Sequence, residues 1–454
     1  MGRARGPRPR RRRAGQGGPG PHRQPGTRRA PHHGSAGPDR PRRLGARTVN
    51  AVVIGGGVAG LAAAHRFARS GESVTVVEAT DRLGGMVMPI TLAGERVDGG
   101  AEAFARRLGT ADALCATLGL EVREPEGGPR IRWSVDESWP GADGVLGIPA
   151  SPDDPALSAA LDEQQLALAL AEPELADEVG VDATTVGELV TARLGEAVTR
   201  RLVAPVTRGV YGMPPERMAL AQFAPGLVGP GSLYAKVAAA RGTRSSVAQP
   251  VGGLFRLVEA LADDIRDHGG EIRLGERVED LNALDADQVV IACPARPAAD
   301  LLRQLGIEVG TPPTTASQNV MLALDPAQLD GAPVGSGVLL GQPLPGLTAR
   351  ALTHYSAKWP WSGTRVAVLR LSYAPDATPT TEQALADASL LLGRPVTRAL
   401  DVAVTRWPAV PRSLGPEART ALLAQLPGHM RLAGAWVFGN GIEAAIASGL
   451  EAAA

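Results

Sequence analysis

The sequence predicts a mixed α/β fold built around a nucleotide-binding unit, and three consecutive observations predict it. Residues 52–60 read Val-Val-Ile-Gly-Gly-Gly-Val-Ala-Gly, a short apolar strand that breaks at glycines. An apolar segment at 61–69 then favours a helix, and 73–77 alternates as a second strand that ends at Glu78. Strand, glycine turn, helix, strand and terminal acid in this order are typical of a βαβ unit that binds a dinucleotide.

The glycines of the turn have different structural roles. Gly55 allows a sharp turn, Gly57 lets the backbone approach a pyrophosphate, and Gly60 lets the helix pack on the strand. The helix offers free N–H groups and a positive dipole end to phosphates. Glu78, about 18 residues after Gly60, can bind the ribose hydroxyls. The turn residues expected at the nucleotide are Gly55, Gly56, Gly57, Val58, Ala59 and Gly60.

A second glycine pair indicates which dinucleotide cofactor the protein binds. Residues 78–85 read Glu-Ala-Thr-Asp-Arg-Leu-Gly-Gly, and an NAD-binding unit needs no such loop after its acid. The arrangement resembles the flavoprotein family of amine oxidases, carotenoid desaturases and protoporphyrinogen oxidases, where this loop closes over the FAD pyrophosphate. Close backbone approach by the glycines and a charge-assisted bond from the arginine fit that role; the alternative is an ordinary turn with a solvated arginine. The loop residues expected at FAD are Glu78, Ala79, Arg82, Gly85 and Met86.

The length of the chain predicts two domains. The cysteines, which lack the spacing of metal ligands, predict a cytoplasmic protein without a metal site. The chain has 454 residues, 44% of them apolar, and no charge-free run of membrane-spanning length. The apolar segment 49–64 follows arginines, but its glycines sit where a nucleotide turn needs them, so it is not an export signal. Cys115 and Cys293, in a predicted helix and a predicted strand, are expected to be buried core thiols.

The formal net charge of zero hides an uneven distribution. Residues 1–47 contain 14 arginines and a single acid, Asp39, with many prolines and glycines. Residues 48–454 keep 33 basic against 46 acidic residues. A nucleic-acid-binding arm is one interpretation of the tail, but such a composition cannot form a core. We expect a disordered or mis-assigned extension, and no nucleic-acid partner.

The pattern along the chain predicts a discontinuous Rossmann-like FAD/NAD(P)-binding domain with an inserted substrate domain of helices and antiparallel sheet. The FAD-binding domain is expected to comprise 48–105, 245–310 and 395–454, and the substrate domain 106–244 and 311–394. The principal elements expected are a hairpin at 88–104 turning at Ala93-Gly94, helices at 111–118, 254–268 and 294–305, and strands at 271–274, 277–281, 288–292, 317–324, 337–340 and 365–373.

Three further segments resemble the bacterial protoporphyrinogen/coproporphyrinogen III oxidases. They are Asp-Gly-Gly-Ala-Glu-Ala-Phe at 98–104, Pro-Val-Thr-Arg-Gly-Val-Tyr-Gly at 205–212, and the glycine-rich strand, loop and helix at 432–449. The first and last are expected beside the flavin, with the helix beginning near Asn440. The resemblance adds these residues to the expected FAD site: Gly100, Ala101, Glu102, Val278, Trp436, Asn440, Gly441 and Ile442.

The resemblance implies an oxidation of coproporphyrinogen III to coproporphyrin III in haem biosynthesis. Three two-electron steps would each pass a hydride to flavin N5, and O2 would reoxidise the flavin and give H2O2. Protoporphyrinogen IX is a second candidate substrate, ferrochelatase a candidate partner, and any membrane contact would be peripheral. No dedicated general base is visible, so Ala101, Glu102 and Asn440 are candidates for the catalytic centre only through their expected place beside the flavin.

The chain departs from the family pattern near the tyrosine motif. Met213 and Ala219 stand where glycine and serine are usual, and Arg208 is unusual beside them. A flavin amine oxidase is the main alternative, with Lys358 as the candidate for the lysine that such enzymes often hold near the flavin. A carotenoid desaturase and a non-catalytic flavoprotein partner of a haem enzyme are the others. Arginine placement should distinguish a four-propionate from a two-propionate substrate.

The composition of the tail generates a first prediction. A chain that begins at Val49 should fold, bind FAD and melt at the same temperature as the full chain, because residues 1–47 cannot contribute to a core. Flavin absorbance and thermal unfolding of the two proteins check this. Loss of flavin or precipitation of the shortened chain would contradict it.

Overall fold

The structure, a computed structural model, describes residues 49–242, 245–310, 312, 314–329, 331–362, 365–411, 413–439 and 441–454. These belong to one compact unit. The predicted disordered extension, residues 1–47, lies outside the described residues.

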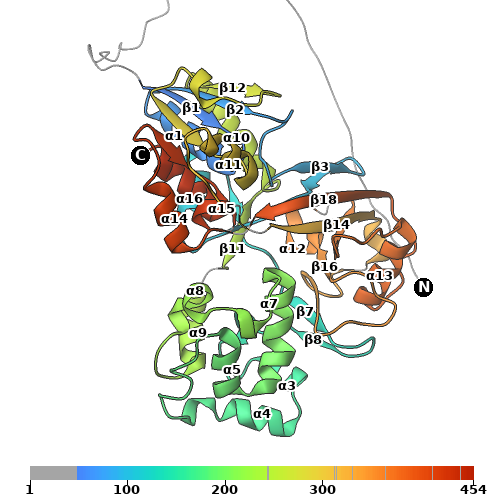
Figure 1. The fold of residues 1–454 in the computed structure, drawn as a ribbon. Helices are drawn as coiled ribbons and strands as arrows, with labels where there is room; N and C mark the ends of the chain where they lie inside the picture. The colour runs from blue at the N-terminus through green and yellow to red at the C-terminus, as the bar shows by residue number, and fades with distance from the viewer. Residues whose placement is uncertain are drawn as a thin grey trace, which may run out of the picture. The chain divides into compact units, whose positions relative to one another are not determined.

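A five-stranded parallel sheet carries the predicted nucleotide-binding unit (Figure 1). Its order is β12 (Glu271–Leu274), β2 (Ser73–Glu78), β1 (Asn50–Ile54), β13 (Gln288–Ile291) and β19 (Met430–Leu432). In the register, Val53 lies between Val76 and Val290. The parallel sheet formed from distant segments confirms the predicted α/β class.

Helices cover both faces of this sheet, which is why its central strands are almost entirely apolar. One face packs against α1 (Val58–Arg69), α10 (Phe255–Asp267) and α16 (Ile442–Ala452). The other packs against α11 (Ala295–Arg303), with α14 (Pro416–Leu423) and α15 (Ala435–Phe438) nearby.

Two glycines allow unusually close packing around α1. A Cβ on Gly60 would lie 1.9 Å from the Gly55 carbonyl oxygen, and a Cβ on Gly449 of α16 would lie 2.0 Å from the Ala59 carbonyl oxygen. The backbones of strand, turn and both helices are therefore in direct contact, as predicted for Gly60.

The second large sheet has seven strands and is mostly antiparallel; among its described strand pairs, only β15–β7 is parallel. Helix α13 (Thr381–Leu392) packs on it. The order is β18 (Asp401–Pro411), β14 (Thr314–Leu324), β17 (Ala367–Tyr373), β16 (Ala351–His354), β15 (Gly337–Leu340), β7 (Pro129–Arg132) and β8 (Ser138–Pro140).

Residues 155–241 form a helical segment (Figure 1), which has its own apolar core. Its main helices are α3 (Pro155–Ala160), α4 (Glu163–Leu170), α5 (Val186–Leu194), α7 (Ala204–Tyr211) and α9 (Leu233–Arg241). Short strands β5 (Phe104–Ala105), β11 (Val247–Pro250) and β6 (Val122–Arg123) form a third sheet where the chain enters and leaves this segment. The hairpin of β3 (Pro89–Leu92) and β4 (Glu95–Asp98) turns at Ala93-Gly94, both with positive φ, as predicted.

Two predicted domain boundaries differ from the structure. The substrate domain was expected to start at 106, yet α2 (Thr110–Thr117) buries Leu114 and Cys115 in the core shared by α1 and α16. Residues 395–454 were assigned to the FAD-binding domain, yet β18 pairs with β14 in the seven-stranded sheet. Both segments have amphipathic patterns that local sequence cannot assign to one core or another.

The predicted strand at 277–281 is wrong. After β12 the backbone N–H groups of Gly275 and Glu276 bond to the carbonyls of Thr80 and Glu78, which draws the chain across the carboxyl end of β2. Residues 277–280 therefore have no strand to pair with, and a 3-10 turn follows at Leu281–Ala283. Alternating apolar residues alone do not form a strand without a ladder partner.

None of the helices in the described ranges combines the length and the apolar character needed to cross a bilayer.

The α1–α16 contact generates a second prediction. Gly449→Ala should destabilise the protein by about 1–3 kcal/mol, because the added methyl group forces the two helix backbones apart. Gly428→Ala is the matched control, since its Cβ would meet no atom within 4 Å. Thermal unfolding of both variants measures the difference, and equal melting temperatures would contradict the packing described here.

Candidate functional site

A cavity of about 2900 Å³ opens at the carboxyl ends of β1, β2 and β13 and continues to α7 and the start of β16. Pockets for one small ligand are usually about 300–1,000 Å³. The space is thus large enough for a dinucleotide and a second ligand. Its position agrees with the rule that ligands of parallel sheets bind at the carboxyl ends of the strands.

The glycine turn forms one wall of this cavity. The Gly55 N–H donates to the Val77 carbonyl at 2.8 Å, which fixes the turn on β2. Gly57 precedes α1 with an ordinary φ of −71°, and no side chain caps the helix. A Cβ on Gly57 would meet nothing within 4 Å. The protein itself does not require glycine there, whereas a phosphate lying against the turn would.

Glu78 lies at the carboxyl end of β2 and lines the cavity. Its Oε2 accepts the Gly56 N–H at 2.7 Å, and its Oε1 accepts the Thr80 N–H and hydroxyl at 2.8 and 2.7 Å. These bonds hold the carboxylate at the edge of the glycine turn. That is the place at which a carboxylate can receive ribose hydroxyls.

The second glycine loop lies on the first. The Gly84 N–H donates to the Gly56 carbonyl at 2.8 Å. Arg82 donates to the Gly85 carbonyl at 2.8 Å and the Leu83 carbonyl at 3.2 Å. Arg82 lines the cavity, but its visible partners are carbonyls of its own loop. Its predicted bond to phosphate stays a prediction, and its observed role is to hold the loop closed.

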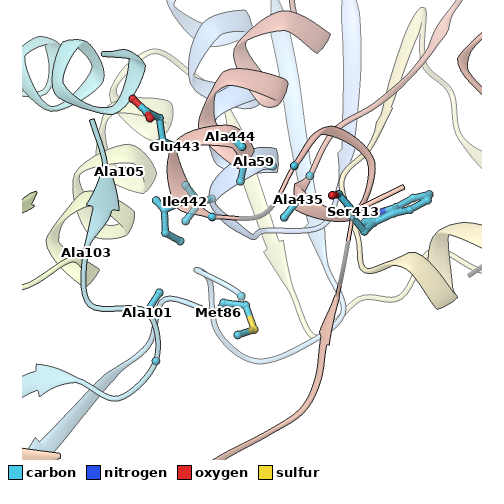
Figure 2. Close-up of a pocket in the computed structure, with 18 of the residues that line it drawn as sticks. Ala59, Met86, Ala101, Ala103, Ala105, Ser413, Ala435, Ile442, Glu443 and Ala444 are labelled. Carbon is cyan, nitrogen blue, oxygen red and sulfur yellow. The ribbon is translucent and has the colours of Figure 1, made fainter. Parts of the chain in front are cut away.

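Small side chains surround the next part of the cavity (Figure 2). Met86 and Ala101 lie opposite Ile442, and the Ala101 N–H donates to the Met86 carbonyl at 2.9 Å. A Cβ on Gly100 would lie 2.1 Å from the same carbonyl, so the two loops are in contact. Alanines at this position, including Ala103, leave room for a flat ring.

The N-terminus of α16 faces the same space. Gly441, with φ +106°, precedes the helix without a side-chain cap, and Gly441 and Ile442 line the cavity. Free N–H groups at a helix N-terminus stabilise negative charge. Asn440 lies outside the described residues. Trp436 lines the cavity and its indole N–H donates to the Cys293 carbonyl at 3.1 Å.

Glu102 does not line the cavity, in contrast to its expected place beside the flavin. Its carboxylate bonds to Lys358 and, at 3.2 Å, to Arg370. Burial opposes ionisation of Glu102, but the charges of Lys358 and Arg370 outweigh it and lower the pKa of this carboxyl. Arg370 does line the cavity and also donates to the Gly100 carbonyl at 3.0 Å. The ion pairs of Glu102 with Lys358 and Arg370 therefore hold the loop in place on the side away from the cavity.

Asp98 joins this loop to α10 from a fully buried position. Its carboxylate accepts the N–H groups of Leu254 and Phe255 at 2.9 and 3.1 Å and the Tyr355 hydroxyl at 2.9 Å. Burial raises the pKa of Asp98 to about 7, although these hydrogen bonds act in the opposite direction. Sequence reasoning placed the Asp98 segment near the flavin but did not foresee this structural role.

Val278, which the resemblance adds to the expected FAD site, also lines the cavity. Cys293 lines the cavity as well and packs, partly buried, against a core of the parallel sheet, so the prediction of two buried core thiols is confirmed for Cys115 and only in part for Cys293. Burial raises the pKa of the Cys293 thiol to about 12, so it stays protonated. Cys293 follows β13, and the rule of carboxyl strand ends could have found it from the predicted strand alone.

Most of the predicted cofactor residues share this one cavity. Gly56 and Gly60 do not line it, because they support the turn from within. Those that line it are Gly55, Gly57, Val58, Ala59, Glu78, Ala79, Arg82, Gly85, Met86, Gly100, Ala101, Val278, Trp436, Gly441 and Ile442. Sequence reasoning missed Ala103 and Glu443, which also line the cavity; the Glu443 carboxylate accepts the Leu108 N–H at 3.0 Å.

The fold and the cavity fit a protein that binds a dinucleotide. Comparison with known proteins agrees: the family described as flavin-containing amine oxidoreductase matches residues 58–454. The chain belongs to this family, whose members contain a flavin.

The similar proteins include relatives named coproporphyrinogen III oxidase and a solved structure with the same fold. The chain is 30% identical to the coproporphyrinogen III oxidase of Mycobacterium tuberculosis (strain H37Rv) over 432 residues, which cover 87% of this chain and 94% of that protein. It is 29% identical to the Mycobacterium leprae protein of the same name, with 87% and 95% covered. A solved putative protoporphyrinogen oxidase from Exiguobacterium sp. 255-15 has the same fold, with a TM-score of 0.72 at 24% identity over 90% of this chain and 98% of that one.

The site generates a third prediction. Gly57→Val should leave folding of the apoprotein unchanged but abolish FAD binding, because the side chain enters space that only a ligand would fill. Glu78→Ala should raise the FAD dissociation constant roughly ten- to a hundredfold, since charge-assisted bonds are worth about 1.5–3 kcal/mol.

Flavin titration of the apoproteins measures both effects. Glu271→Ala, on the edge strand β12 and paired with Arg273, is the control that should bind FAD like the wild type. Wild-type affinity in both site variants would refute the assignment.

Proposed function

We propose that this protein oxidises coproporphyrinogen III to coproporphyrin III, with FAD as cofactor and O2 as electron acceptor. The observation that supports this most is the similarity along 87% of the chain to relatives named coproporphyrinogen III oxidase. In the balanced reaction the porphyrinogen loses six electrons and six protons, and three molecules of O2 become three molecules of H2O2.

The extent of the cavity supports the proposal that the substrate is as large as a porphyrinogen. The cavity beside Met86, Ala101 and Ile442 (Figure 2) is also lined by residues of α7 and by the start of β16. A macrocycle that enters from α7 could therefore reach the ring of the cofactor. FAD, when bound, supplies the two-electron redox chemistry.

The residues of this chain act by binding and orientation. The N-termini of α1 and α16 offer free N–H groups to negative charge on the cofactor. With FAD bound, Glu78, held by the Gly56 N–H, would receive ribose hydroxyls, and the loop that Arg82 holds closed would cover the pyrophosphate. Arg370 holds the loop at 100–102 through the Gly100 carbonyl and the Glu102 carboxylate.

The cavity wall does not favour the amine oxidase alternative. Among the described residues that line the cavity there is no lysine or histidine. Lys358, the candidate for a lysine near the flavin, bonds to Glu102 behind the loop. Protoporphyrinogen IX as a second substrate, ferrochelatase as a partner and a cytoplasmic location stay predictions.

The fourth prediction separates the alternatives. The purified holoprotein should convert non-fluorescent coproporphyrinogen III to fluorescent coproporphyrin III in air and release H2O2 without added NAD or metal. Without O2, the porphyrinogen should bleach the flavin absorbance and the reaction should then stop. Benzylamine and polyamines should not bleach it.

Two results would overturn this function. If amines bleach the flavin and porphyrinogens do not, the protein is an amine oxidase. If neither does, a non-catalytic flavoprotein is the better interpretation.

A further inference from the structure

The part of the cavity away from the glycine turns has an excess of positive charge. Arginines line it from four separate elements, and its acids Glu124 and Asp143 are already paired, with Arg106 and Arg241 at 2.5 and 2.7 Å. Four exposed arginines have no ion pair with a carboxylate in the described ranges: Arg107, Arg208, Arg217 and Arg350.

These four arginines surround α7. Arg208 is on that helix, and Arg107 is close enough to Tyr211 at its end that its charge opposes the rise that burial causes in the pKa of the Tyr211 hydroxyl. A Cβ on Gly209 would lie 2.7 Å from Leu339 of β15, so α7 lies against the sheet whose next strand, β16, begins directly after Arg350.

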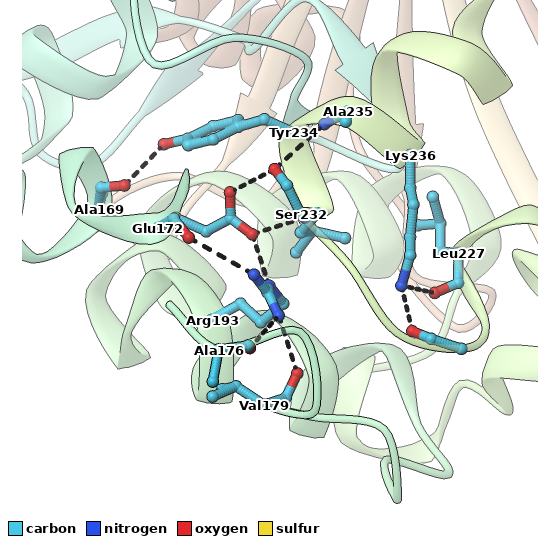
Figure 3. A network of polar contacts seen from close by, with 12 residues as sticks. Ala169, Glu172, Ala176, Val179, Arg193, Leu227, Ser232, Tyr234, Ala235 and Lys236 are labelled. Carbon is cyan, nitrogen blue, oxygen red and sulfur yellow. Dashed lines mark hydrogen bonds and ion pairs between the residues drawn. The ribbon is translucent and has the colours of Figure 1, made fainter. Parts of the chain in front are cut away.

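Buried contacts support Arg217 from behind. Arg217 ends a 3-10 turn that packs on α5, since a Cβ on Gly187 would lie 2.9 Å from the Glu216 nitrogen. Helix α5 is held by the fully buried Arg193–Glu172 ion pair at 2.5 Å, whose carboxylate also accepts the Ser232 hydroxyl at 2.7 Å (Figure 3). Charges supported in this way can select a ligand by the spacing of its anions.

Between the arginines the wall is apolar and aromatic. Val210 is 63% exposed and Tyr211 47% exposed although both line the cavity, and Tyr211 packs edge-on against Phe223 with ring centroids 6.1 Å apart. Large exposed apolar groups in a cavity indicate a ligand that covers them. The complementary ligand is a flat apolar body with carboxylates on its edge.

We propose that Arg107, Arg208, Arg217 and Arg350 are the specificity-determining residues of this enzyme, binding the carboxylates of a four-carboxylate macrocycle and favouring it over a two-carboxylate one. This inference rests on the proposed porphyrinogen oxidation. Four separate cations match four anions, whereas a two-carboxylate substrate leaves half of them unpaired.

The test uses the four single Arg→Gln variants of the holoenzyme, with Arg303→Gln as control because Arg303 lies on α11 outside the cavity, paired with Asp300. Each cavity variant should lower kcat/KM for coproporphyrinogen III by roughly tenfold or more. The preference over protoporphyrinogen IX should shrink. Flavin content and melting temperature should match the wild type, because all four side chains are exposed.

Binding provides a readout that needs no turnover. Coproporphyrin III should bind the cavity variants more weakly than the wild type, while its uncharged tetramethyl ester should bind all of them equally. If the wild type oxidises coproporphyrinogen III but the variants keep both its affinity and its preference, the arginine assignment is wrong and the proposed function stands. If the wild type oxidises no porphyrinogen yet the variants lose coproporphyrin binding, the function is wrong and the carboxylate site stands.

Discussion

The close contact between α1 and α16 is the constraint on which the rest of the site depends. Gly60 and Gly449 remove the side chains that would separate the turn and the two helices, and the contact distances leave no room even for a methyl group. As a result, two uncapped helix N-termini open into one cavity. Each N-terminus favours negative charge, so one can hold a pyrophosphate while the other faces the ring of the same cofactor.

A second set of contacts joins the nucleotide-binding sheet to the seven-stranded sheet. Glu102 pairs with Lys358 and Arg370, while Asp98 binds Tyr355 and the start of α10. Asp98 ends β4 of the hairpin and Glu102 lies in the loop after it, whereas Arg370 is on β17 and Tyr355 and Lys358 are on the short helix that follows β16. Removing one partner of a buried ion pair leaves an uncompensated charge, which is strongly destabilising. We infer that the cluster sets the wall between cofactor and substrate and does no chemistry itself.

The sequence predicted the parts of the site that depend on local rules. Residue order alone predicts three features: the turn at Gly55–Gly60, the acid Glu78 and the helix that begins after Gly441. The effects involved are the backbone freedom of glycine, the dipole of a helix and the position of an acid at the end of a strand, and each acts within a few residues. The predictions that differ from the structure concern contacts between distant parts of the chain. The segment 277–281 looked like a strand but has no neighbour, β18 joined another sheet, and Glu102 turned toward two cations more than 250 residues away. The arginine arrangement around α7 could not be predicted, since four elements contribute one charge each.

The most direct test of this account is a crystal structure of the protein with FAD and coproporphyrin III. We predict that the flavin ring lies between Ala101 and the N-terminus of α16. The macrocycle should lie beside it against Tyr211, with its propionates paired with Arg208 and the neighbouring arginines. A porphyrin bound outside this cavity, or a flavin ring directed away from Ala101, would contradict the claim that one cavity holds both.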